Sequence, residues 1–325
     1  MTVRIDDLLG LINKEITKYS FEGYPSELYE PMRYIMDLGG KRMRPLLTLL
    51  SYSLYKDDPE NIIEPAMAVE VFHNFTLMHD DIMDQAPLRR GKQTVHEKWN
   101  SSIAILSGDA MLVKAYKMFL TVENGRLNRV LKAFNRTAIE VCEGQQKDMN
   151  FEDRLDVSVE EYLDMISQKT AVLLGFSLEL GALLGGADDR NCQFIREFGV
   201  NIGVGFQLKD DLLDVYADQA KFGKQVGGDI IANKKTFLLI EALEMAEGNT
   251  KKELERWLKM EEFDKEEKVE AVKAIYDELN IKAITEEKMA QYFDTGFKSL
   301  KKLEVPLNKR AVLRGFAEDL INREK

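Results

Sequence analysis

The sequence predicts an all-α protein, and three observations support this. All seven prolines lie at positions 25, 31, 45, 59, 65, 87 and 306. The long stretch between the last two therefore lacks the main interrupter of helices. Within it, apolar residues recur mostly three and four positions apart, as in Ile195, Phe198, Ile202 and Phe206. No segment alternates apolar and polar residues as a series of short strands would. We therefore expect a helical bundle.

Capping residues locate the first of its long helices. Pro65 suits the first turn of a helix that carries the sequence HDDIMD, and Pro87 lies just beyond its end. Ser158 and Glu161 have the spacing of a capping box, which would begin a helix that ends near residue 185. Both boundaries come from local sequence alone.

The remaining helices follow from the same signals. Asp188 or Asp189 can cap a helix that runs through KDDLLD and stops near Ala217. From about Glu241 onward the chain is predicted to form charged amphipathic helices of an outer, solvated layer. Because no linker or low-complexity tract interrupts the sequence, we expect residues 1–325 to form a single domain.

Composition excludes several classes of function. The 325 residues carry a formal charge of −11, which argues against a nucleic-acid-binding surface. The longest apolar tract, residues 171–187, contains Glu179 and is interpreted as a buried helix rather than a membrane span. The N-terminal sequence is acidic and lacks the apolar stretch of a signal peptide. Two cysteines, Cys142 and Cys192, suit a reducing compartment, so a cytoplasmic protein is expected.

The most informative motif is an acidic pattern, DDxxD, that occurs twice. Its first and last aspartates are four positions apart, so on a helix they share one face. Six carboxylates would repel one another unless cations lay between them. Mg²⁺ prefers carboxylate, water and phosphate oxygens, which points to chemistry on a diphosphate. The candidate metal ligands are Asp80, Asp81, Asp84, Asp210, Asp211 and Asp214.

One DDxxD sequence alone would be weak evidence, because acidic pairs are common on solvated helix faces. Here both copies lie among apolar residues, where carboxylates need cations or hydrogen-bond donors. An EF-hand does not fit, because its alternate-residue ligand loop with a central glycine is missing.

Basic residues accompany each acidic motif. GGKRMRP, residues 39–45, offers a flexible turn and three cations for phosphate oxygens, and Arg89 and Arg90 follow the first motif. Lys169 with Thr170 precedes the second motif. A segment rich in glycine and lysine follows the second motif, and its Lys224 and Lys234 could balance the negative charge of a leaving diphosphate. The loop of this segment would be shaped by Gly227, Gly228 and Asp229. The histidines, none of which has partners for a nucleophilic triad, are His73, His79 and His96.

These motifs, in this order, resemble the trans-isoprenyl diphosphate synthases (polyprenyl synthetases), and they span roughly residues 39–236. The resemblance implies the isoprenoid synthase fold, a large helical bundle around a central cavity, and a homodimer. It also implies three Mg²⁺ that bridge the aspartates to an allylic diphosphate. The implied substrates are isopentenyl diphosphate and the allylic dimethylallyl, geranyl and farnesyl diphosphates.

The resemblance assigns a role to each motif residue. Asp80, Asp84 and Asp210 would bind metal, with the other three aspartates supporting them. Isopentenyl diphosphate would be held by Lys41, Arg44, His73 and Arg90. The allylic diphosphate would be held by Arg89, Lys169, Thr170, Gln207, Lys224 and Lys234, of which Arg89, Lys169 and Lys224 would also assist its departure. The motif GQQKD supplies Gln145 and Asp148, which would orient Lys169 or metal-bound water.

Two departures from the family pattern stand out. Lys209 replaces a more usual glutamine, which would tune affinity, and Gln85, Ala86 and Pro87 stand where relatives often carry further acidic residues. Neither change puts the reaction in doubt.

The implied mechanism is electrostatic. Mg²⁺ and the basic residues would stabilise the departing diphosphate, and the double bond of isopentenyl diphosphate would attack the allylic cation. The diphosphate would take the proton, so no side-chain general base is required.

Product length would be set on the helix of the first motif. Phe75 and Thr76 lie five and four residues before Asp80, about one turn deeper, and Phe72 lies a further turn down. From spacing alone, Phe75 could equally be ordinary core. In the family, an aromatic residue at this position resembles geranylgeranyl diphosphate synthases, which favours a C20 product over C15.

Other functions remain open at this point. A terpene cyclase would need only one diphosphate, and GGKRMRP, Arg90 and the second DDxxD argue against it. A non-catalytic subunit of a synthase would be expected to lose one acidic motif, and this chain retains both.

Overall fold

The computed structural model describes residues 4–19, 21–152, 154–217 and 227–322. The chain divides into two compact units. The first comprises residues 1–136, 176–196 and 303–313, and the second comprises residues 137–175, 197–302 and 314–325. Each unit is described by itself below, and the expectation of one domain stays a prediction.

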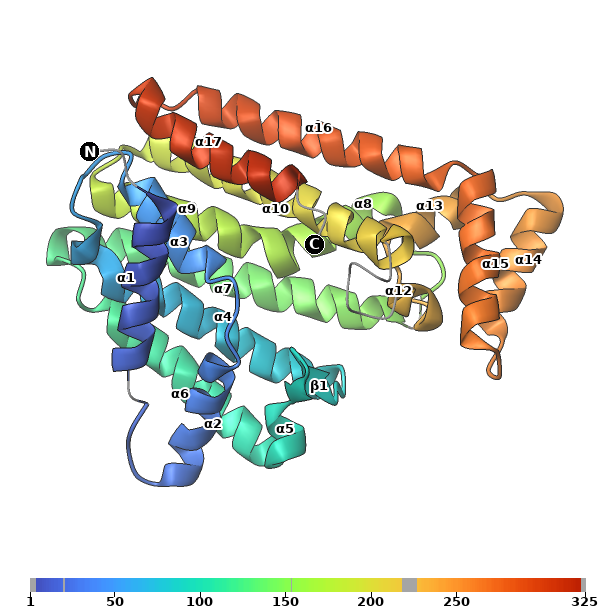
Figure 1. Cartoon of the computed structure of the whole chain (residues 1–325), viewed down its shortest axis with the longest axis horizontal. Coiled ribbons are helices and arrows are strands. Elements are labelled where there is room, and N and C mark those ends of the chain that lie inside the picture. Colours follow the sequence, from blue (N-terminus) through green and yellow to red (C-terminus); the bar gives the residue numbers. More distant parts are fainter. Residues whose placement is uncertain (1–3, 20, 153, 218–226, 323–325) are drawn as a thin grey trace. The chain divides into compact units, whose positions relative to one another are not determined.

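The prediction of an all-α protein is confirmed (Figure 1). Elements of the first unit are α1 (Ile5–Lys18), α2 (Ser26–Asp37), α3 (Met43–Tyr52), the 3₁₀ helix η1 (Pro59–Ile62), α4 (Ile63–Met83), β1 (Leu88–Arg89), β2 (Lys92–Gln93), α5 (Val95–Lys98) and α6 (Ser101–Phe119). Elements of the second unit are α8 (Val159–Ile166), the π-helical turn η2 (Ser167–Ala171), α12 (Gly228–Ile231), α13 (Phe237–Met245), α14 (Gly248–Lys259), α15 (Lys265–Glu278) and α16 (Ile281–Lys301). Four helices have residues in both units: α7 (Asn124–Glu152), α9 (Val172–Gly185), α10 (Asp189–Tyr216) and α17 (Leu307–Asn322).

In the first unit, α4 packs closely against α6 and α3. The first half of α4 is buried without a break from Pro65 to Phe72, and Asn74, Met78 and Asp81 continue the buried side of the helix into the first acidic motif. Gly181 of α9 allows close contact with α3, because a Cβ atom there would lie 2.1 Å from the carbonyl oxygen of Thr48. The hydroxyl of Ser51 donates a 2.6 Å hydrogen bond to the carbonyl of Leu178 across the same contact.

An aromatic cluster fills the core of the first unit. The rings of Phe72 and Phe134 meet edge to face with centroids 5.0 Å apart, and Phe134 also contacts Phe119, Phe176 and Tyr116 at 4.8 to 5.7 Å. Edge-to-face and tilted pairs of this kind stabilise beyond the area they bury. The cluster therefore forms a firm wall behind α4.

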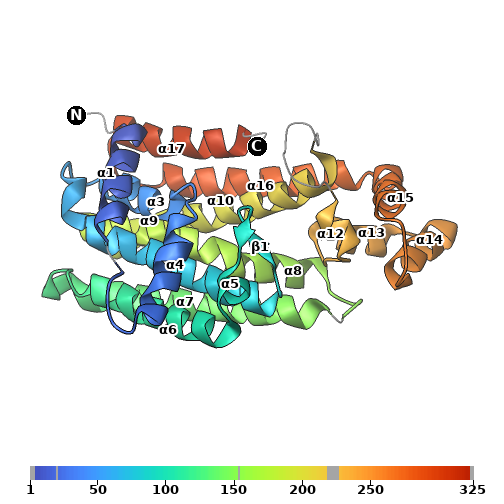
Figure 2. The same cartoon turned by 60° about the horizontal axis from the view of Figure 1, so that its bottom comes forward.

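The second unit has two hydrophobic clusters. One joins α8, α10 and α13 through residues such as Tyr162, Leu208 and Phe237. The other joins α13, α14 and α15 through residues such as Leu239 and Trp257. In Figures 1 and 2, α14 and α15 lie side by side, next to the short helix α12.

Local signals predicted the helix boundaries well. The capping box of Ser158 and Glu161 is present with both of its hydrogen bonds. Asp188 accepts a hydrogen bond from the backbone of Asn191 and caps α10, which ends at Tyr216. One expectation was wrong in detail, because the helix that begins after Ser158 is interrupted by the π-turn η2 before it continues as α9.

A small hairpin also departs from the purely helical prediction. Strands β1 and β2 pair antiparallel, with Leu88 opposite Gln93 and Arg89 opposite Lys92. The two residues between them, Arg90 and Gly91, both have positive φ, at 54° and 74°. Paired positive φ values are typical of a type I′ turn, which a search for longer alternating strands does not detect.

Candidate active site

The first acidic motif lies at the C-terminal end of α4. Asp84 is the C-cap residue that follows Met83, the last residue of α4, and Gln85 turns the chain with φ of 48°. The backbone N–H of Ala86 donates to the carbonyl of Asp81, and that of Gln85 donates to the carbonyl of Ile82. These bonds are those of a Schellman ending, so the motif stands where the helix stops.

The three aspartates of this motif differ in exposure. Asp84 is exposed and the Asp80 carboxylate is about one-fifth exposed, whereas Asp81 is buried. Arg89 of β1 holds the Asp81 carboxylate with Nε at 2.8 Å and 2.9 Å, and it lies 3.6 Å from Asp80. Burial raises the pKa of Asp81, and Arg89 acts against that rise. Asp81 therefore anchors Arg89, while Asp80 and Asp84 are the members placed to meet a ligand.

The glycine turn before α3 divides its three cations between two roles. Arg42 adopts a left-handed conformation with φ of 48°, and its side chain is buried. Its guanidinium bonds Glu70 Oε1 at 2.8 Å and the carbonyl of Met36 at 2.7 Å. Arg42 thus ties the turn to α4 and is not available to a phosphate. The motif contributes Lys41, which is exposed, and Arg44 to a candidate ligand site.

Arg90 closes the other side of this turn. Its guanidinium donates to the carbonyl of Gly39 and lies over Gly40, where a Cβ atom would be 2.9 Å from Nη2. Gly40 has φ of 139°, so the lack of a side chain is required for both the turn and the contact. The hairpin and the glycine turn together place Arg90 beside the residues that lead into α3.

His73 lies among the positively charged arginines of the same region. Burial lowers the pKa of His73 well below its usual value, and the charges of Arg44, Arg90, Arg89 and Arg42 lower it further. Burial also lowers the pKa of Arg44 to about 10, with Glu70 opposing the change. Buried Nε of Arg44 has no hydrogen-bond partner among the described residues. His73 is therefore neutral, and the arginines around it leave a strong positive field for an anion.

Phe75 lies one turn before the first motif, next to the aromatic cluster. Its ring lies 5.6 Å from that of Phe72 and 4.7 Å from that of His79, and the side chain is half-buried. Thr76 donates its hydroxyl back to the carbonyl of His73. His79 packs over Gly108 and lies 3.2 Å from the carbonyl of Ile105, which suits a core histidine. Phe75 is thus the outermost ring of a backed aromatic wall.

In the second unit, the second acidic motif lies near the end of α10. Its middle member, Asp211, is buried and accepts hydrogen bonds from the Tyr162 hydroxyl and, at 3.1 Å, from Gln207 Nε2. Burial raises the pKa of Asp211 to about 7. Asp210 is exposed on the same helix. The second motif therefore shows the same difference between its aspartates as the first motif. The middle aspartate contacts protein partners, and the first is more exposed.

Asp214, the last member, holds the segment that follows. Its Oδ2 accepts the backbone N–H of Asp229 at 2.9 Å, and its carbonyl accepts that of Gly227 at 2.6 Å. The predicted metal ligand is therefore engaged with the start of α12. Its remaining oxygen, Oδ1, would lie 3.4 Å from a Cβ atom built on Gly228.

Lys169 and Thr170 lie in the π-turn η2, a kind of helix interruption that often marks functional sites. Gly144 of α7 allows the turn to approach, because a Cβ atom there would lie 2.2 Å from the backbone nitrogen of Lys169. Lys169 Nζ bonds Asp148 Oδ2 at 2.6 Å, which agrees with the expected orienting role of Asp148. The buried Nε2 of Gln145 has no hydrogen-bond partner among the described residues, and the orienting role of Gln145 stays a prediction.

Thr170 and Gln207 also meet. The hydroxyl of Thr170 lies 3.5 Å from Gln207 Oε1, and Gln207 in turn contacts Asp211. The structure thus links the π-turn to the second acidic motif. Lys209, the departure from the family pattern, instead donates to the carbonyl of Ile321 in α17.

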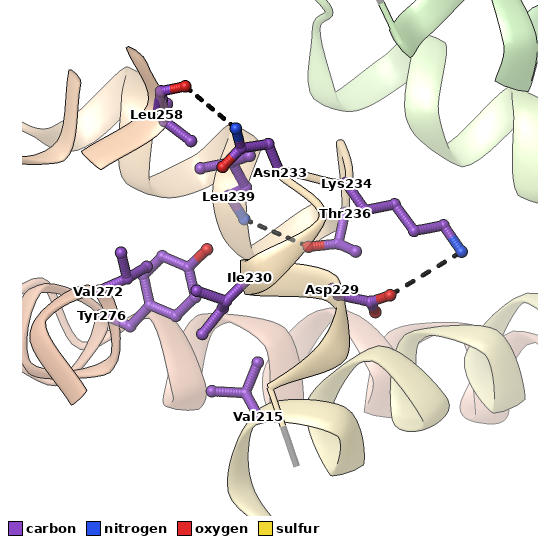
Figure 3. A pocket seen from close by; sticks show the side chains of 10 residues that line it. All are labelled: Val215, Asp229, Ile230, Asn233, Lys234, Thr236, Leu239, Leu258, Val272 and Tyr276. Carbon is purple, nitrogen blue, oxygen red and sulfur yellow. Dashed lines mark hydrogen bonds and ion pairs between the residues drawn. The ribbon is translucent and has the colours of Figure 1, made fainter. Parts of the chain in front are cut away.

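Lys234 completes the cationic group of the second unit. Its Nζ lies 4.0 Å from Asp229 Oδ1 (Figure 3). Burial lowers the pKa of Lys234, but the carboxylates of Asp229, Asp148 and Asp211 outweigh it and raise the pKa overall. Lys234 is therefore charged, and it shares the influence of the Asp148 carboxylate with Lys169. Lys224, the other lysine predicted here, lies outside the described residues.

The carboxylates suit Mg²⁺, although the described residues contain no group of three or more His, Cys, Asp or Glu side chains arranged to hold a metal. Mg²⁺ is usually bound through one or two carboxylates together with waters and substrate phosphates rather than in an all-protein cage. Outward-facing Asp80, Asp84 and Asp210 provide the hard oxygen donors that such binding needs.

Sequence reasoning missed the inward partners. Glu70 pairs with Arg42 from 28 positions away, and Tyr162 pairs with Asp211 from 49 positions away. Neither has a local signal, because each pairing depends on tertiary packing. The π-turn was also missed; Gly144, which permits it, is the first residue of GQQKD and could have drawn attention to a close backbone approach.

Within the described residues, none of the helices combines the length and apolar character that a membrane span requires.

Comparison with known proteins shows the family to which the chain belongs. The polyprenyl synthetase family profile matches residues 25–278. A geranylgeranyl diphosphate synthase of Sulfolobus acidocaldarius is 41% identical over 81% of this chain and 80% of the relative. A short chain isoprenyl diphosphate synthase of Methanocaldococcus jannaschii is 40% identical over 83% of this chain and 82% of the relative.

A solved structure extends the likeness to the fold. The crystal structure of a geranylgeranyl pyrophosphate synthase superposes with a TM-score of 0.94 at 42% identity, covering 99% of this chain and 100% of the other. The all-α architecture is thus that of the isoprenoid synthase fold. The chain belongs to the polyprenyl synthetase family.

Proposed function

We propose that this protein is a Mg²⁺-dependent trans-prenyltransferase that makes geranylgeranyl diphosphate. It would condense isopentenyl diphosphate head to tail (1′-4) with dimethylallyl, geranyl and farnesyl diphosphates. The observation that carries the proposal is the paired construction of the two acidic motifs. In each, the middle aspartate is buried against protein partners while the first is more exposed, within a family whose relatives bear synthase names.

The first substrate site would bind isopentenyl diphosphate through Lys41, Arg44, His73 and Arg90. Support comes from the electrostatics of the first unit, where burial lowers the pKa of His73 and four nearby arginines lower it further. A neutral His73 donates one N–H to a phosphate oxygen, and Arg44 and Arg90 supply charge-assisted hydrogen bonds. A diphosphate oxygen would accept a hydrogen bond from Nε of Arg44, which has no partner among the described residues.

The second substrate site would bind the allylic diphosphate. Lys169, Thr170, Gln207 and Lys234 are the second-unit residues proposed for it, together with Lys224 and Arg89. Their support is the chain of contacts around the π-turn and the carboxylate of Asp148, which bonds Lys169 and helps to raise the pKa of Lys234. Asp148 keeps Lys169 in place until a phosphate oxygen competes for its ammonium group.

The outward aspartates Asp80, Asp84 and Asp210 would hold Mg²⁺, three ions being the number that the family resemblance implies. When bound, Mg²⁺ neutralises charge that develops on the leaving diphosphate. Asp81 and Asp211 would act indirectly, the first by fixing Arg89 and the second by fixing Gln207. Asp214 would hold α12 in place.

The reaction then follows from charge and position. Arg89, Lys169 and Lys224 would stabilise the diphosphate as its C–O bond breaks and an allylic cation forms, and Lys234 would add to the positive charge. The double bond of isopentenyl diphosphate, fixed by the basic residues of the first unit, attacks the cation and forms the new C–C bond. The released diphosphate accepts the proton that restores a double bond, so the histidines need not act as bases.

Product length would be limited by Phe75. Support comes from its position one turn before Asp80 and from the aromatic rings that back it. An elongating tail that runs along α4 would meet this ring, which the ring of Phe72 backs. A C20 product agrees with the names of the relatives, and a C15 product is the alternative.

The protein is further proposed to act as a homodimer in the cytoplasm. Along α6, Ile105, Leu106, Val113 and Leu120 are 45% to 66% exposed, which is unusual for large apolar side chains on a water-facing helix. A second copy would cover them. Both cysteines are free, which suits a reducing compartment.

One assay separates the candidate functions. Purified protein is incubated with Mg²⁺, labelled isopentenyl diphosphate and C5, C10 or C15 allylic primers. Labelled C20 diphosphate from every primer supports the proposal, and a product that stops at C15 supports the farnesyl alternative. Cyclic hydrocarbons without incorporated label would indicate a terpene cyclase, and a lack of turnover would indicate a non-catalytic subunit.

A further inference from the structure

A short segment that joins α12 to α13 carries two of the polar residues of the second unit. We refer to residues 227–236 as the α12 loop; it contains Asp229 and Lys234. Its first turn is fixed by Asp214, whose side chain and carbonyl accept the N–H groups of Asp229 and Gly227. Gly227 has φ of 86°, and a Cβ atom there would lie 2.6 Å from Val269 of α15. The start of the loop is thus firmly seated.

The end of α12 is held by a buried lysine that the proposed mechanism does not use. Lys268 of α15 has no exposed surface. Its ammonium group donates to Asn233 Oδ1 at 2.7 Å and to the carbonyl of Ile231 at 3.4 Å, and it lies 4.0 Å from the centre of the Phe263 ring. Within the described part of the chain, no carboxylate forms an ion pair with it. A buried cation is costly unless polar groups satisfy it, so these contacts are tightly coupled to the position of the loop.

Asn233 connects the Lys268 contact to the neighbouring residues of the α12 loop. It has φ of 52°, and its Nδ2 donates to the carbonyl of Leu258 at the end of α14 at 3.0 Å. The next residue, Lys234, donates its backbone N–H to the carbonyl of Asp229 at 2.9 Å. A shift of Asn233 would therefore move both Lys234 and Asp229.

Packing alone does not fix the loop. A small pocket lies behind it, lined on one side by Asp229, Asn233 and Lys234 and on the other by Val272 and Tyr276 (Figure 3). Because contact with α15 is incomplete at the pocket, the loop depends on its polar attachments at the two ends. Lys268 supplies the attachment nearer to Lys234.

We propose that Lys268 is a positioning residue for the allylic diphosphate site, acting through Asn233 on Lys234 and Asp229. It holds the α12 loop so that the ammonium of Lys234 meets the diphosphate without a reorganisation cost. This inference rests on the proposed function. It assigns a role to a residue outside every motif that the sequence offered.

The test is the Lys268→Met variant, which removes the ammonium group but keeps an apolar chain of similar length. We expect its KM for farnesyl diphosphate to rise about tenfold, the effect of losing one hydrogen bond to a charged group. Binding of Mg²⁺ with inorganic pyrophosphate, measured by calorimetry, should weaken by a similar factor. The KM for isopentenyl diphosphate should stay within about twofold of the wild type.

Two further variants separate positioning from folding. Asn233→Gly tolerates positive φ but removes the relay, so it should reproduce the selective rise in KM even if Lys268→Met fails to fold. Asn233→Asp keeps an oxygen acceptor for Lys268 but loses the Nδ2 donor to the Leu258 carbonyl, so its KM for farnesyl diphosphate should rise less than that of Asn233→Gly. Lys265→Met, an exposed lysine on the same helix, is the matched control and should change neither KM.

Hydrogen exchange gives a readout without turnover. In Lys268→Met the amides of residues 229–236 should exchange faster, while those of α7 keep their protection. Equal rises in both KM values, or unchanged exchange in the loop, would overturn the inference. Failure of the wild type to elongate any primer would instead overturn the proposed function, so the two failures are distinguishable.

Discussion

Replacing Phe75 by alanine should lengthen the product. Phe75 lies five residues before Asp80, roughly 7.5 Å along the axis of α4 at 1.5 Å per residue. It is the outermost ring of the wall, in contact with Phe72 and His79. Removing the ring opens space where the growing tail is proposed to stop. We therefore expect products of C25 and longer beside a diminished C20 fraction.

The cost in stability can be worked from burial. A fully buried phenylalanine replaced by alanine costs about 3–5 kcal/mol, and Phe75 is only half-buried, so about 2 kcal/mol is expected. Phe72 provides the matched comparison, since its side chain is 1% exposed and lies behind Phe75. Phe72→Ala should cost about 4 kcal/mol, yet it should leave product length unchanged as long as Phe75 remains. The double variant should give the longest products.

The assay is chromatography of the dephosphorylated products, with denaturant unfolding run on the same samples. An unchanged product distribution in Phe75→Ala would refute Phe75 as the limit. Lengthening by Phe72→Ala alone would move the limit deeper into the aromatic cluster.

Three further results are expected. The His73→Gln variant should lose less stability at acidic pH than the wild type, because the folded protein holds His73 neutral while the unfolded chain protonates it below about pH 6.5. The free energy of unfolding of the wild type should therefore fall faster between pH 6.5 and 5 than that of the variant. Parallel curves of unfolding free energy against pH would contradict this. Glu70→Gln should cost about 3 kcal/mol by leaving Arg42 buried without its partner, whereas replacing both by methionine should cost less, as denaturant titration can check. Asp81→Asn should release Arg89 and raise the KM for the allylic diphosphate about tenfold with little change in the isopentenyl value, and equal changes in steady-state kinetics would argue against the anchoring role.

Much of the fold could be predicted because its signals are local. The Ser158 capping box and the Asp188 cap depend on residues three positions apart. The spacing of apolar residues predicted the helices that these capping residues begin. The π-turn could not be found this way, since it depends on Gly144 of a different helix.

The residue types of the candidate site could be predicted from the sequence, but the direction in which each side chain points could not. GGKRMRP offers three cations, and only the structure separates Arg42, which faces Glu70, from Arg44. DDxxD offers three carboxylates, and only the structure separates buried Asp211 from exposed Asp210. Direction depends on tertiary partners far away in sequence, which spacing along one helix does not contain.

The most direct test of the central claim is a single turnover with excess enzyme, farnesyl diphosphate and labelled isopentenyl diphosphate. We expect one labelled geranylgeranyl diphosphate per farnesyl primer, formed only when Mg²⁺ is present and not extended further. Farnesyl diphosphate recovered unchanged in the presence of Mg²⁺, or converted to an unlabelled hydrocarbon, would contradict it.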